Sequence, residues 1–381
     1  MIDSEKKSIC FVAHFAYGAL AGGSAGFIGG VERQTSLMAK WFAKRGYKIS
    51  MITWDEGQKD GEEIDGVKVF KMCREDEGIK GLRFLWPRWT SLVAAMKRAD
   101  ADIYYQNCGE YITGQVALWC RKHNRKFVYS VANDTDCDKS LPEMHKIRER
   151  VLYRYGLGHA DNVIVQTKKQ RDMLRTDFGQ NSIVIPMPCP GLSEEEYAEL
   201  EKKHKKSANV LWLGRICEQK RPDRLLELAK LCDGVQFDFV GPNEGSKYSN
   251  DIIEQVKQVP NITYHGPVSR KDVSKFYKNA RVFCCTSDFE GFPNTFLEAW
   301  SFGLPIVSTF DPDGLIAEKN IGIVAEDIRG LASGINMFIS NFEFCQKVSG
   351  AARRYYQENH TVDSVMPKFE KVFENVITSV I

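Results

Sequence analysis

The chain has 381 residues, of which 43% are hydrophobic and 27% are charged, and its formal net charge is +2. These values are ordinary for a globular protein, so they exclude the disordered and fibrous classes. They also argue against a dedicated nucleic-acid-binding protein, because no strong basic excess is available to meet phosphates. The length is sufficient for two domains.

The eleven cysteines include no Cys-x-x-Cys pair, and several lie within apolar runs. This usage indicates a reduced, cytoplasmic protein with buried thiols. Lys6 and Lys7, followed by an uncharged stretch over residues 9–31, superficially resemble a signal peptide. Glycines and His14 interrupt that stretch, so we favour a strand and loop there. No other segment approaches the roughly 20 apolar residues of a membrane-spanning helix.

Predicted strands and helices alternate along the first half of the sequence. Residues 8–14 are a short apolar run typical of a buried parallel strand, and a glycine-rich loop follows. The segment GGVERQTSLMAKWFAKRG has apolar residues at helical spacing. We expect further strands at residues 48–53, 103–105, 127–131 and 162–166, with helices at residues 112–123 and 145–157.

Three prolines between Pro186 and Pro190 break both helix and strand, so we place a domain boundary there. The same alternation then restarts, with strands expected at residues 210–213, 236–240, 262–265, 282–286 and 305–308 and helices at residues 222–232, 270–278 and 295–302. The prediction is an α/β fold of two tandem Rossmann-like, doubly wound domains with a ligand cleft between them. Their bounds are residues 1–190 and 191–360, and an amphipathic segment, residues 361–381, is expected to pack back on the first domain.

The segment SDFEGFPNTFLEAWSFGLPIVST, residues 287–309, is the most specific feature of the sequence. Asn294 is expected to cap the helix at residues 295–302. The backbone amides from Phe292 to Thr295 would then form an anion site at the helix N-terminus.

Two carboxylates accompany this expected anion site, Glu290 and Glu298, eight residues apart. Glu298 could accept hydrogen bonds from two ribose hydroxyls, and Glu290 would lie nearer to the group attached to the phosphates. The alternative is an ordinary βα unit whose two glutamates face water.

The segment LGRICEQKRPDRLLELA, residues 213–229, places Arg215 and Lys220 between a strand and a helix that opens at Pro222. We expect these two cations to lie at strand ends facing the Glu290 loop. A diphosphate leaving group needs such charges, because negative charge builds on it as a glycosidic bond breaks.

The glycine cluster at residues 22–30 is neither a G-x-G-x-x-G fingerprint nor a Walker A loop. It places flexible backbone ahead of a helix N-terminus, where it could close on a phosphate or sugar. A merely permissive loop is the alternative.

Together these motifs resemble the retaining GT-B glycosyltransferases of family four, the group 1 transferases, in order and spacing over nearly the whole chain. The similarity is greatest to bacterial enzymes of exopolysaccharide, capsule and lipopolysaccharide assembly. It implies that Arg215 and Lys220 bind the donor diphosphate, Glu298 the ribose and Glu290 the donor sugar. The further donor-binding residues that it implies are Gly29, Gly30, Phe292, Pro293, Asn294 and Thr295, with Gly266 and Val268 near the base.

The sequence departs from this family at one position of the first domain. Where the family usually has His-Asp, VYSVANDTD places Asn133 and then Asp134, which we expect on the acceptor side. Asn133 can hydrogen-bond a sugar but cannot take a proton. Retaining transfer need not require a base at this position, because the departing phosphate can receive the acceptor's proton.

The run from Asp134 to Asp138 also suggests a metal site, but it lacks the glycine and distant glutamate of a calcium loop, so we expect no metal. The interleaved basic and aromatic residues 83–89 could rest on a membrane and present a lipid-linked acceptor, or they could pack against the sheet.

The predicted function is therefore retaining, metal-independent transfer of a sugar from a UDP- or GDP-type donor to a saccharide or lipid-linked saccharide. No cofactor is expected, and the location expected is the cytoplasm or the inner face of the membrane. The alternatives are a GT-B-fold nucleotide-sugar epimerase and an inactive sugar-nucleotide-binding protein.

Overall fold

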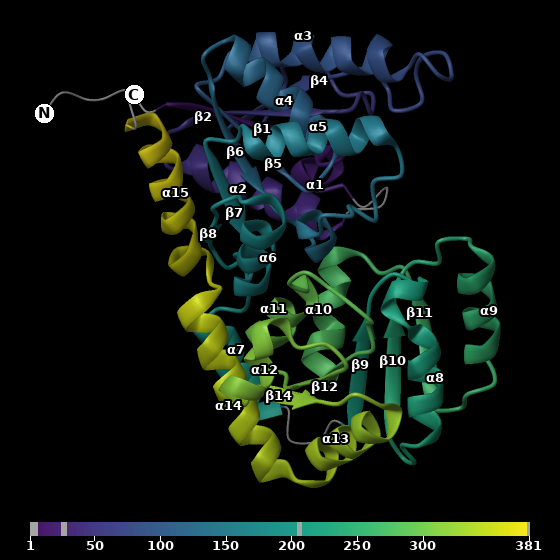
Figure 1. Ribbon diagram of the computed structural model, residues 1–381. Coiled ribbons are helices and arrows are strands. Elements are labelled where there is room, and N and C mark those ends of the chain that lie inside the picture. The colour runs from purple at the N-terminus through teal and green to yellow at the C-terminus, as the bar shows by residue number, and fades with distance from the viewer. Residues whose placement is uncertain (1–6, 24–28, 204–207, 379–381) are drawn as a thin grey trace, which may run out of the picture. The chain divides into compact units, whose positions relative to one another are not determined.

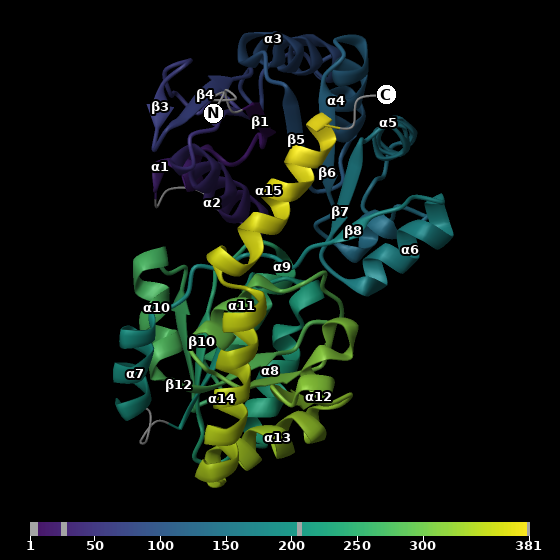
Figure 2. The same cartoon turned by 90° about the vertical axis from the view of Figure 1, so that its left-hand side faces the viewer.

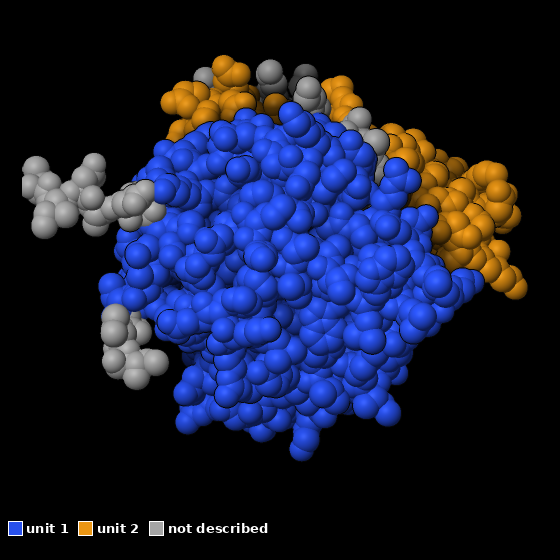
Figure 3. Space-filling model, turned by 90° about the horizontal axis from the view of Figure 1, so that it is seen from above, with its two compact units in different colours: residues 1–187, 365–381 blue, residues 188–364 orange. Residues whose placement is uncertain are grey.

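The computed structural model describes residues 7–23, 29–203 and 208–378. The chain divides into two compact units, which Figure 3 colours separately. Unit 1 comprises Met1–Met187 together with Val365–Ile381, and unit 2 comprises Pro188–Ser364. The change of unit between Met187 and Pro188 falls within the proline-rich segment.

Unit 1 is built on a sheet with the strand order β3-β4-β2-β1-β5-β6-β7-β8, parallel except for the β3–β4 pair (Figure 1). Its strands are β1 (Ser8–Val12), β2 (Lys48–Thr53), β3 (Glu63–Ile64), β4 (Val67–Lys71), β5 (Ile103–Asn107), β6 (Lys126–Ser130), β7 (Asn162–Val165) and β8 (Ile183–Val184). Its helices are α1 (Tyr17–Ala21), α2 (Gly30–Lys44), α3 (Thr90–Ala99), α4 (Tyr111–Lys122), α5 (Ile147–Gly158) and α6 (Lys168–Phe178). A π-helical segment, η1 (Phe84–Trp89), precedes α3, and a 3₁₀ turn, η2 (Asp134–Cys137), follows β6.

Both faces of this sheet are buried, which explains why its strands are continuous apolar runs rather than alternating ones. Cys10 belongs to the apolar cluster that α3, α4 and α5 complete. The next residue, Phe11, points to the opposite face, where its ring lies 6.4 Å from that of Phe42 in α2 and 5.3 Å from that of Tyr105.

Helix α15 (Val362–Thr378) belongs to unit 1 from Val365 onward, and Figure 2 shows it in yellow beside α2. The buried Phe373 ring lies 5.1 Å from that of Phe42 and 5.8 Å from that of Tyr105. Glu370 accepts a hydrogen bond from the hydroxyl of Tyr47 at 3.0 Å. The last helix therefore completes the core that the first strand and helix begin.

Unit 2 has a parallel sheet with the order β11-β10-β9-β12-β13-β14. Its strands are β9 (Asn209–Leu213), β10 (Gln236–Val240), β11 (Ile262–Gly266), β12 (Ala280–Cys285), β13 (Ile306–Ser308) and β14 (Gly322–Val324). Its helices are α7 (Glu194–Lys203), α8 (Pro222–Lys230), α9 (Lys247–Val256), α10 (Arg270–Asn279), α11 (Asn294–Ser301), α12 (Leu315–Lys319), α13 (Ile328–Ser340) and α14 (Phe342–Asn359). Two 3₁₀ turns, η4 (Glu218–Lys220) and η5 (Pro312–Gly314), lie in its loops.

The strand order reverses once in each unit, between β1 and β5 in unit 1 and between β9 and β12 in unit 2. Right-handed crossovers that run in opposite directions place their helices on opposite faces of the sheet. The loops on either side of the reversal then diverge, and a crevice opens at the carboxyl ends of those strands. The structure confirms the predicted α/β, doubly wound fold class, and these two edges are where ligands of such folds bind.

We expect Phe373→Ala to destabilise unit 1 by about 3–5 kcal/mol, because it removes a buried ring from a close-packed core. Hydrogen exchange followed by mass spectrometry should show faster exchange in β1 and β5 and unchanged exchange in β12 of unit 2. Lys371→Ala, at an exposed position of the same helix, is the matched control. Unchanged protection of β1 and β5 in the Phe373 variant would contradict the role given to α15.

Candidate functional site

Two loops meet at the point where the strand order of unit 2 reverses, one after β9 and one after β12. The backbone amide of Asp288 donates to the carbonyl of Gln219 at 3.0 Å, and the Gln219 side-chain amide donates to the carbonyl of Phe289 at 2.9 Å. The hydroxyl of Thr286 donates to the carbonyl of Lys220 at 2.8 Å. These bonds hold η4 against the loop that carries Glu290.

Lys220 and Glu290 form the centre of this site. The ammonium Nζ of Lys220 donates a hydrogen bond to Oε1 of Glu290, and the hydroxyl of Ser287 donates to the same oxygen at 2.7 Å. The two side chains are only 20% and 9% exposed. Burying a carboxylate is costly unless a charged partner and hydrogen bonds accompany it, and this one has both.

Glu298 lies within α11 and is also buried, with 7% of its surface exposed. Its Oε2 accepts a hydrogen bond at 2.8 Å from the hydroxyl of Tyr277, a buried residue of α10. Neither glutamate of the motif therefore faces water, and the alternative of an ordinary βα unit with solvent-facing glutamates is wrong.

The start of α11 differs by one residue from the prediction. The helix begins at Asn294, and Pro293 occupies the capping position with no side-chain hydrogen bond, so the prediction that Asn294 caps the helix is wrong. Pro293 is suited to this position because its φ of −65° leads directly into the helix. The amide of Phe296 makes a bond to the carbonyl of Pro293 at 3.0 Å, so the preceding amides of Asn294 and Thr295 form the N-terminus of the helix.

The side chain of Phe292 is turned away from this helix end. Its ring lies 5.3 Å from that of His360 and 6.1 Å from that of Trp300. Phe292 thus packs within unit 2, and only its backbone is available for the anion-binding role that the sequence suggested.

Arg215 follows β9, but its guanidinium pairs with Glu244, in the loop after β10, at 3.0 Å. The site therefore has two cations with different carboxylate partners, Lys220 with Glu290 and Arg215 with Glu244. Gly266 ends the edge strand β11, and Val268 follows in the next loop. Gly241 follows the adjacent β10, and an added Cβ there would collide with the carbonyl oxygen of Gly214, so only glycine permits the loops after β9 and β10 to approach.

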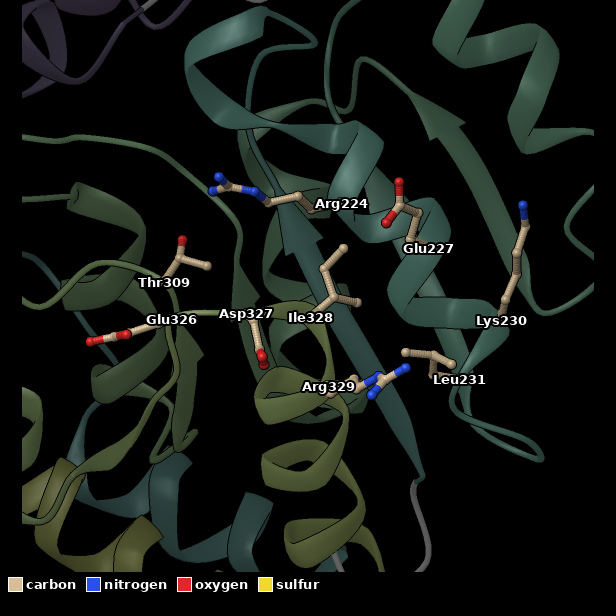
Figure 4. Close-up of a pocket in the computed structure, with 9 residues that line it drawn as sticks. All are labelled: Arg224, Glu227, Lys230, Leu231, Thr309, Glu326, Asp327, Ile328 and Arg329. Carbon is tan, nitrogen blue, oxygen red and sulfur yellow. The ribbon is translucent and has the colours of Figure 1, made fainter.

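The pockets in the described part of unit 2 include the following two. One, of about 460 Å³, adjoins Lys220 and Glu290 in the chain and is lined by Glu218, Gln219, Arg221, Asp223, Tyr248, Asp288 and Phe289. Figure 4 shows the other, of about 660 Å³, between α8 and the start of α13. None of its lining residues is a site residue proposed from the sequence. The lining consists of Arg224, Glu227, Lys230, Leu231, Thr309, Glu326, Asp327, Ile328 and Arg329.

The corresponding edge of unit 1 brings together two titratable side chains that the motifs did not indicate. His14 follows β1, Glu110 follows β5, and Nε2 of His14 lies 3.4 Å from Oε2 of Glu110. Burial raises the pKa of Glu110 to about 8, with the negative charges of Glu32 and Glu149 adding to the effect. Burial lowers the pKa of His14 to about 4. The only sequence signal was that each residue lies near the end of an apolar strand.

Asn133 and Asp134 lie after β6, where they build a turn. Asn133 caps η2 in a reciprocal pair with Asp136. Asp134 pairs with Lys169 at 2.7 Å. Asp136 accepts backbone N–H groups from Gly109, Ala132 and Asn133 at 3.1 to 3.3 Å, and burial raises its pKa to about 6. Over the described ranges, no group of three or more His, Cys, Asp or Glu residues is placed to hold a metal ion.

Gly29 occupies the capping position of α2 and Gly30 is its first residue. The part of the glycine cluster at residues 24–28 lies outside the described residues. In the described part of the chain, every helix is too short or too polar to cross a bilayer.

Two family models match the chain in tandem. The model described as "Glycosyl transferase 4-like domain" matches residues 29–190, and the model described as "Glycosyl transferases group 1" matches residues 193–355.

Relatives and solved structures agree with these matches. An uncharacterized glycosyltransferase of Haemophilus influenzae is 24% identical over 91% of this chain and 97% of its own length. The amylovoran biosynthesis glycosyltransferase AmsD of Erwinia amylovora is 26% identical over 45% of this chain and 50% of its own length. Sucrose-phosphate synthase from Thermosynechococcus elongatus superposes with a TM-score of 0.80 at 17% identity, covering 98% of this chain and all of that one. HepE of Anabaena in complex with UDP-glucose superposes with a TM-score of 0.75 at 16% identity, covering 97% of this chain and all of that one. At these identities the structures establish the fold.

We expect the stability of unit 1 to fall as the pH rises from 6.5 to 8, because of Glu110. Its pKa is raised from 4.5 to about 8, so the folded state binds more protons than the unfolded state in this window. His14 contributes a change of opposite sign, because its pKa is lowered from 6.5 to about 4, but this change is largely complete by pH 7. Glu110→Gln should abolish this dependence in urea unfolding followed by hydrogen exchange, whereas Glu143→Gln, at an exposed position, should keep it. A Glu110 variant with the wild-type pH dependence would refute the assignment.

Proposed function

Because the chain belongs to the group 1 GT-B glycosyltransferases, we propose that it is a retaining, metal-independent enzyme that uses a UDP- or GDP-sugar. The acceptor that we propose is a saccharide or lipid-linked saccharide of cell-surface polysaccharide assembly. The observation that carries the proposal is the buried pair of Lys220 and Glu290 beside the N-terminus of α11.

The proposed donor site is in unit 2, where each group of the donor has a chemically suited partner. Glu298, buried and already accepting one hydrogen bond, would accept from the ribose hydroxyls. The amides at the start of α11 would bind a phosphate, since a helix N-terminus favours an anion. Gly266 and Val268 would lie by the base, and Gly29 and Gly30 of unit 1 would approach the donor. The solved complex of HepE with UDP-glucose is consistent with a nucleotide-sugar donor of the UDP type.

Lys220 and Arg215 are the proposed partners of the departing diphosphate. In the protein alone each cation is balanced by a glutamate, Lys220 by Glu290 and Arg215 by Glu244. The diphosphate would take up these charges as negative charge develops on it, which is the role that a metal ion has in other phosphate-transfer sites. Two cations and a helix N-terminus are sufficient for that role, and this is the basis of the proposed metal independence.

The proposed stereochemical course is retention. In transfer, the bond from the anomeric carbon to the phosphate oxygen breaks and a bond to the acceptor oxygen forms on the same face. The acceptor's proton passes to the departing phosphate oxygen. The two titratable groups described at the strand reversal of unit 1 are poor alternatives as a base, since Glu110, with a pKa of about 8, is mostly protonated at neutral pH. His14, with a pKa of about 4, is a weak base, and Asn133 cannot accept a proton.

The role in polysaccharide assembly rests on the sequence resemblance and on the likeness to the amylovoran enzyme. The eleven free thiols suit a reducing compartment, so we propose the cytoplasm and the inner face of the membrane as the location.

We expect Lys220→Met or Arg215→Ala to lower kcat/KM by roughly two to three orders of magnitude, because each removes a charge that stabilises the leaving group. Lys230→Ala, which removes an exposed lysine of the same unit, is the control. Wild-type activity should persist in excess chelator. Near-normal turnover in both variants, or activity that needs added Mg²⁺ or Mn²⁺, would contradict the proposal.

A double variant separates catalysis by Lys220 from simple support of Glu290. In Glu290→Gln the buried carboxylate is gone, so it no longer needs the ammonium. If Lys220 binds the leaving group, the double variant should be at least roughly tenfold less active than Glu290→Gln alone. If it only supports Glu290, the single Glu290 variant and the double variant should be equally active.

We expect the product to keep the anomeric configuration of the donor. Glu290→Ala should lower kcat more than it weakens donor binding, because the carboxylate would orient the sugar as positive charge develops. Glu298→Ala should mainly weaken nucleotide binding, measured by calorimetry. Proton NMR of the fresh product tests the course directly, and a β-linked product from an α-linked donor would exclude retention.

A further inference from the structure

Unit 1 exposes an unusual number of large apolar side chains on two short segments. In the segment before α3, Ile79, Leu82, Leu85 and Trp86 are 66%, 60%, 56% and 62% exposed. On the first turns of α5, Ile147 and Val151 are 81% and 58% exposed. Single exposed apolar residues are common, but several gathered together mark an interaction surface.

The packing of each segment explains why these side chains point outward. In η1, the ring of Phe84 lies 5.8 Å from that of Trp89 and 5.3 Å from that of Tyr111 in α4, and Pro87 is buried. These contacts anchor the segment from beneath and leave Leu85 and Trp86 facing water.

Helix α5 packs on α4 through one face only. Tyr153, Gly156 and Leu157 are its buried residues. An added Cβ at Gly156 would lie 2.5 Å from the carbonyl carbon of Thr113, so the two helices are in close contact along this face. Ile147 and Val151, four residues apart, form a stripe outside that buried face.

The two segments lie side by side. The guanidinium carbon of Arg148, on α5, is 4.4 Å from the centroid of the Phe84 ring. The two segments are therefore neighbours, and we define their exposed apolar side chains together as the apolar surface: Ile79, Leu82, Leu85, Trp86, Ile147 and Val151.

The two segments that carry this apolar surface are rich in basic residues. Residues 79–89 and 145–155 contain seven Lys and Arg against one acidic residue, Glu149: Lys80, Arg83, Arg88, Lys146, Arg148, Arg150 and Arg154. Arg83 and Arg88 donate to backbone carbonyls, and their Nε atoms are buried. The exposed basic residues of the two segments are Lys80, Lys146, Arg148 and Arg154. With Glu75, Asp76 and Glu77 of the preceding loop included, the balance is still seven against four.

The apolar surface also adjoins the crevice of unit 1. Phe84 contacts Tyr111, the residue after Glu110, and Glu110 lies 3.4 Å from His14 at the strand reversal. Both segments lead into helices that start at the carboxyl edge of the sheet. An acceptor in this crevice could keep its lipid portion against the apolar surface.

We propose that this apolar and basic surface docks on an anionic lipid bilayer, with Trp86 at the level of the headgroups. Apolar side chains would enter the interface and the exposed Lys and Arg of the same segments would meet lipid phosphates, the pairing that interfacial segments use. The proposal rests on the proposed function only for the statement that the acceptor is lipid-linked. A second copy of the chain or another protein is a different occupant, which the experiment distinguishes.

The test is sedimentation of the full chain with phosphatidylcholine vesicles, with and without phosphatidylglycerol. We expect binding only to the anionic vesicles, weakened by salt. A quadruple serine variant should bind roughly tenfold or more weakly; it combines Leu85→Ser, Trp86→Ser, Ile147→Ser and Val151→Ser. Replacing Lys80 and Lys146 by Gln should lower binding roughly fivefold per residue. The matched control is Leu231→Ser with Met337→Ser, which removes two half-exposed apolar residues of unit 2 and should bind as the wild type does.

Circular dichroism and thermal unfolding verify that the variants fold, which exposed positions allow. No binding of the wild type to anionic vesicles, or equal binding by the serine variant, overturns the proposal. A serine variant that changes from dimer to monomer in light scattering and keeps its vesicle binding assigns the surface to a second copy instead. Transfer to a water-soluble saccharide and to a lipid-linked saccharide is assayed separately. Vesicle binding without transfer refutes the proposed function alone, and transfer without vesicle binding refutes the docking surface alone.

Discussion

The ion pair between Lys220 and Glu290 is the interaction on which the candidate site depends. A carboxylate that is 8% exposed is costly to bury unless a cation and hydrogen bonds accompany it, and here an ammonium and the hydroxyl of Ser287 do so. The pair also joins the loops after β9 and β12, the two strands between which the order of the sheet reverses. The ion pair and the strand order of unit 2 therefore hold the same residues together at one edge of the sheet.

The two strand reversals present different chemistry. In unit 2 the carboxylates are paired with a cation or a hydroxyl, and helix α11 directs its N-terminus toward the same edge. In unit 1 the residues after the strands are held near neutrality, because burial raises the pKa of Glu110 and lowers that of His14. A charged edge suits a diphosphate, whereas an edge with a protonated carboxyl and a neutral imidazole can hydrogen-bond the hydroxyls of a sugar. This contrast supports the division of labour that we propose, with the donor on unit 2 and the acceptor on unit 1.

The apolar surface of unit 1 depends on how α5 packs against α4. Because Gly156 lets the helices touch, Tyr153 and Leu157 fill the contact and the opposite stripe has no covering element within the described part of unit 1. Retaining six large apolar side chains in water has no benefit for folding, so a partner for them is the simpler explanation.

Local patterns in the sequence determined most of the fold. Short apolar runs, glycine loops and helical periodicity predicted the strands and helices, because both faces of a parallel sheet are buried and its strands are continuous apolar runs. The cysteines within apolar runs likewise indicated buried thiols. The segment that contains Glu290, Asn294 and Glu298 indicated a strand–loop–helix motif. The predicted start of α11 was wrong by one residue. Asn294 has the side chain of a typical capping residue, but the structure has Pro293 at the capping position and Asn294 as the first residue of the helix.

Only the tertiary structure decided which distant residues meet. Lys220 and Glu290 are 70 residues apart, and no periodicity links them. Arg215 has an equally suitable place in the sequence, yet it pairs with Glu244, because the loops after β9 and β10 are adjacent there. The meeting of His14 with Glu110 follows from strand order, and the exposure of Ile147 and Val151 on α5 follows from helix packing. Residue patterns fix the secondary structure because it depends on near neighbours, whereas charge pairing and burial depend on contacts that only the folded chain creates.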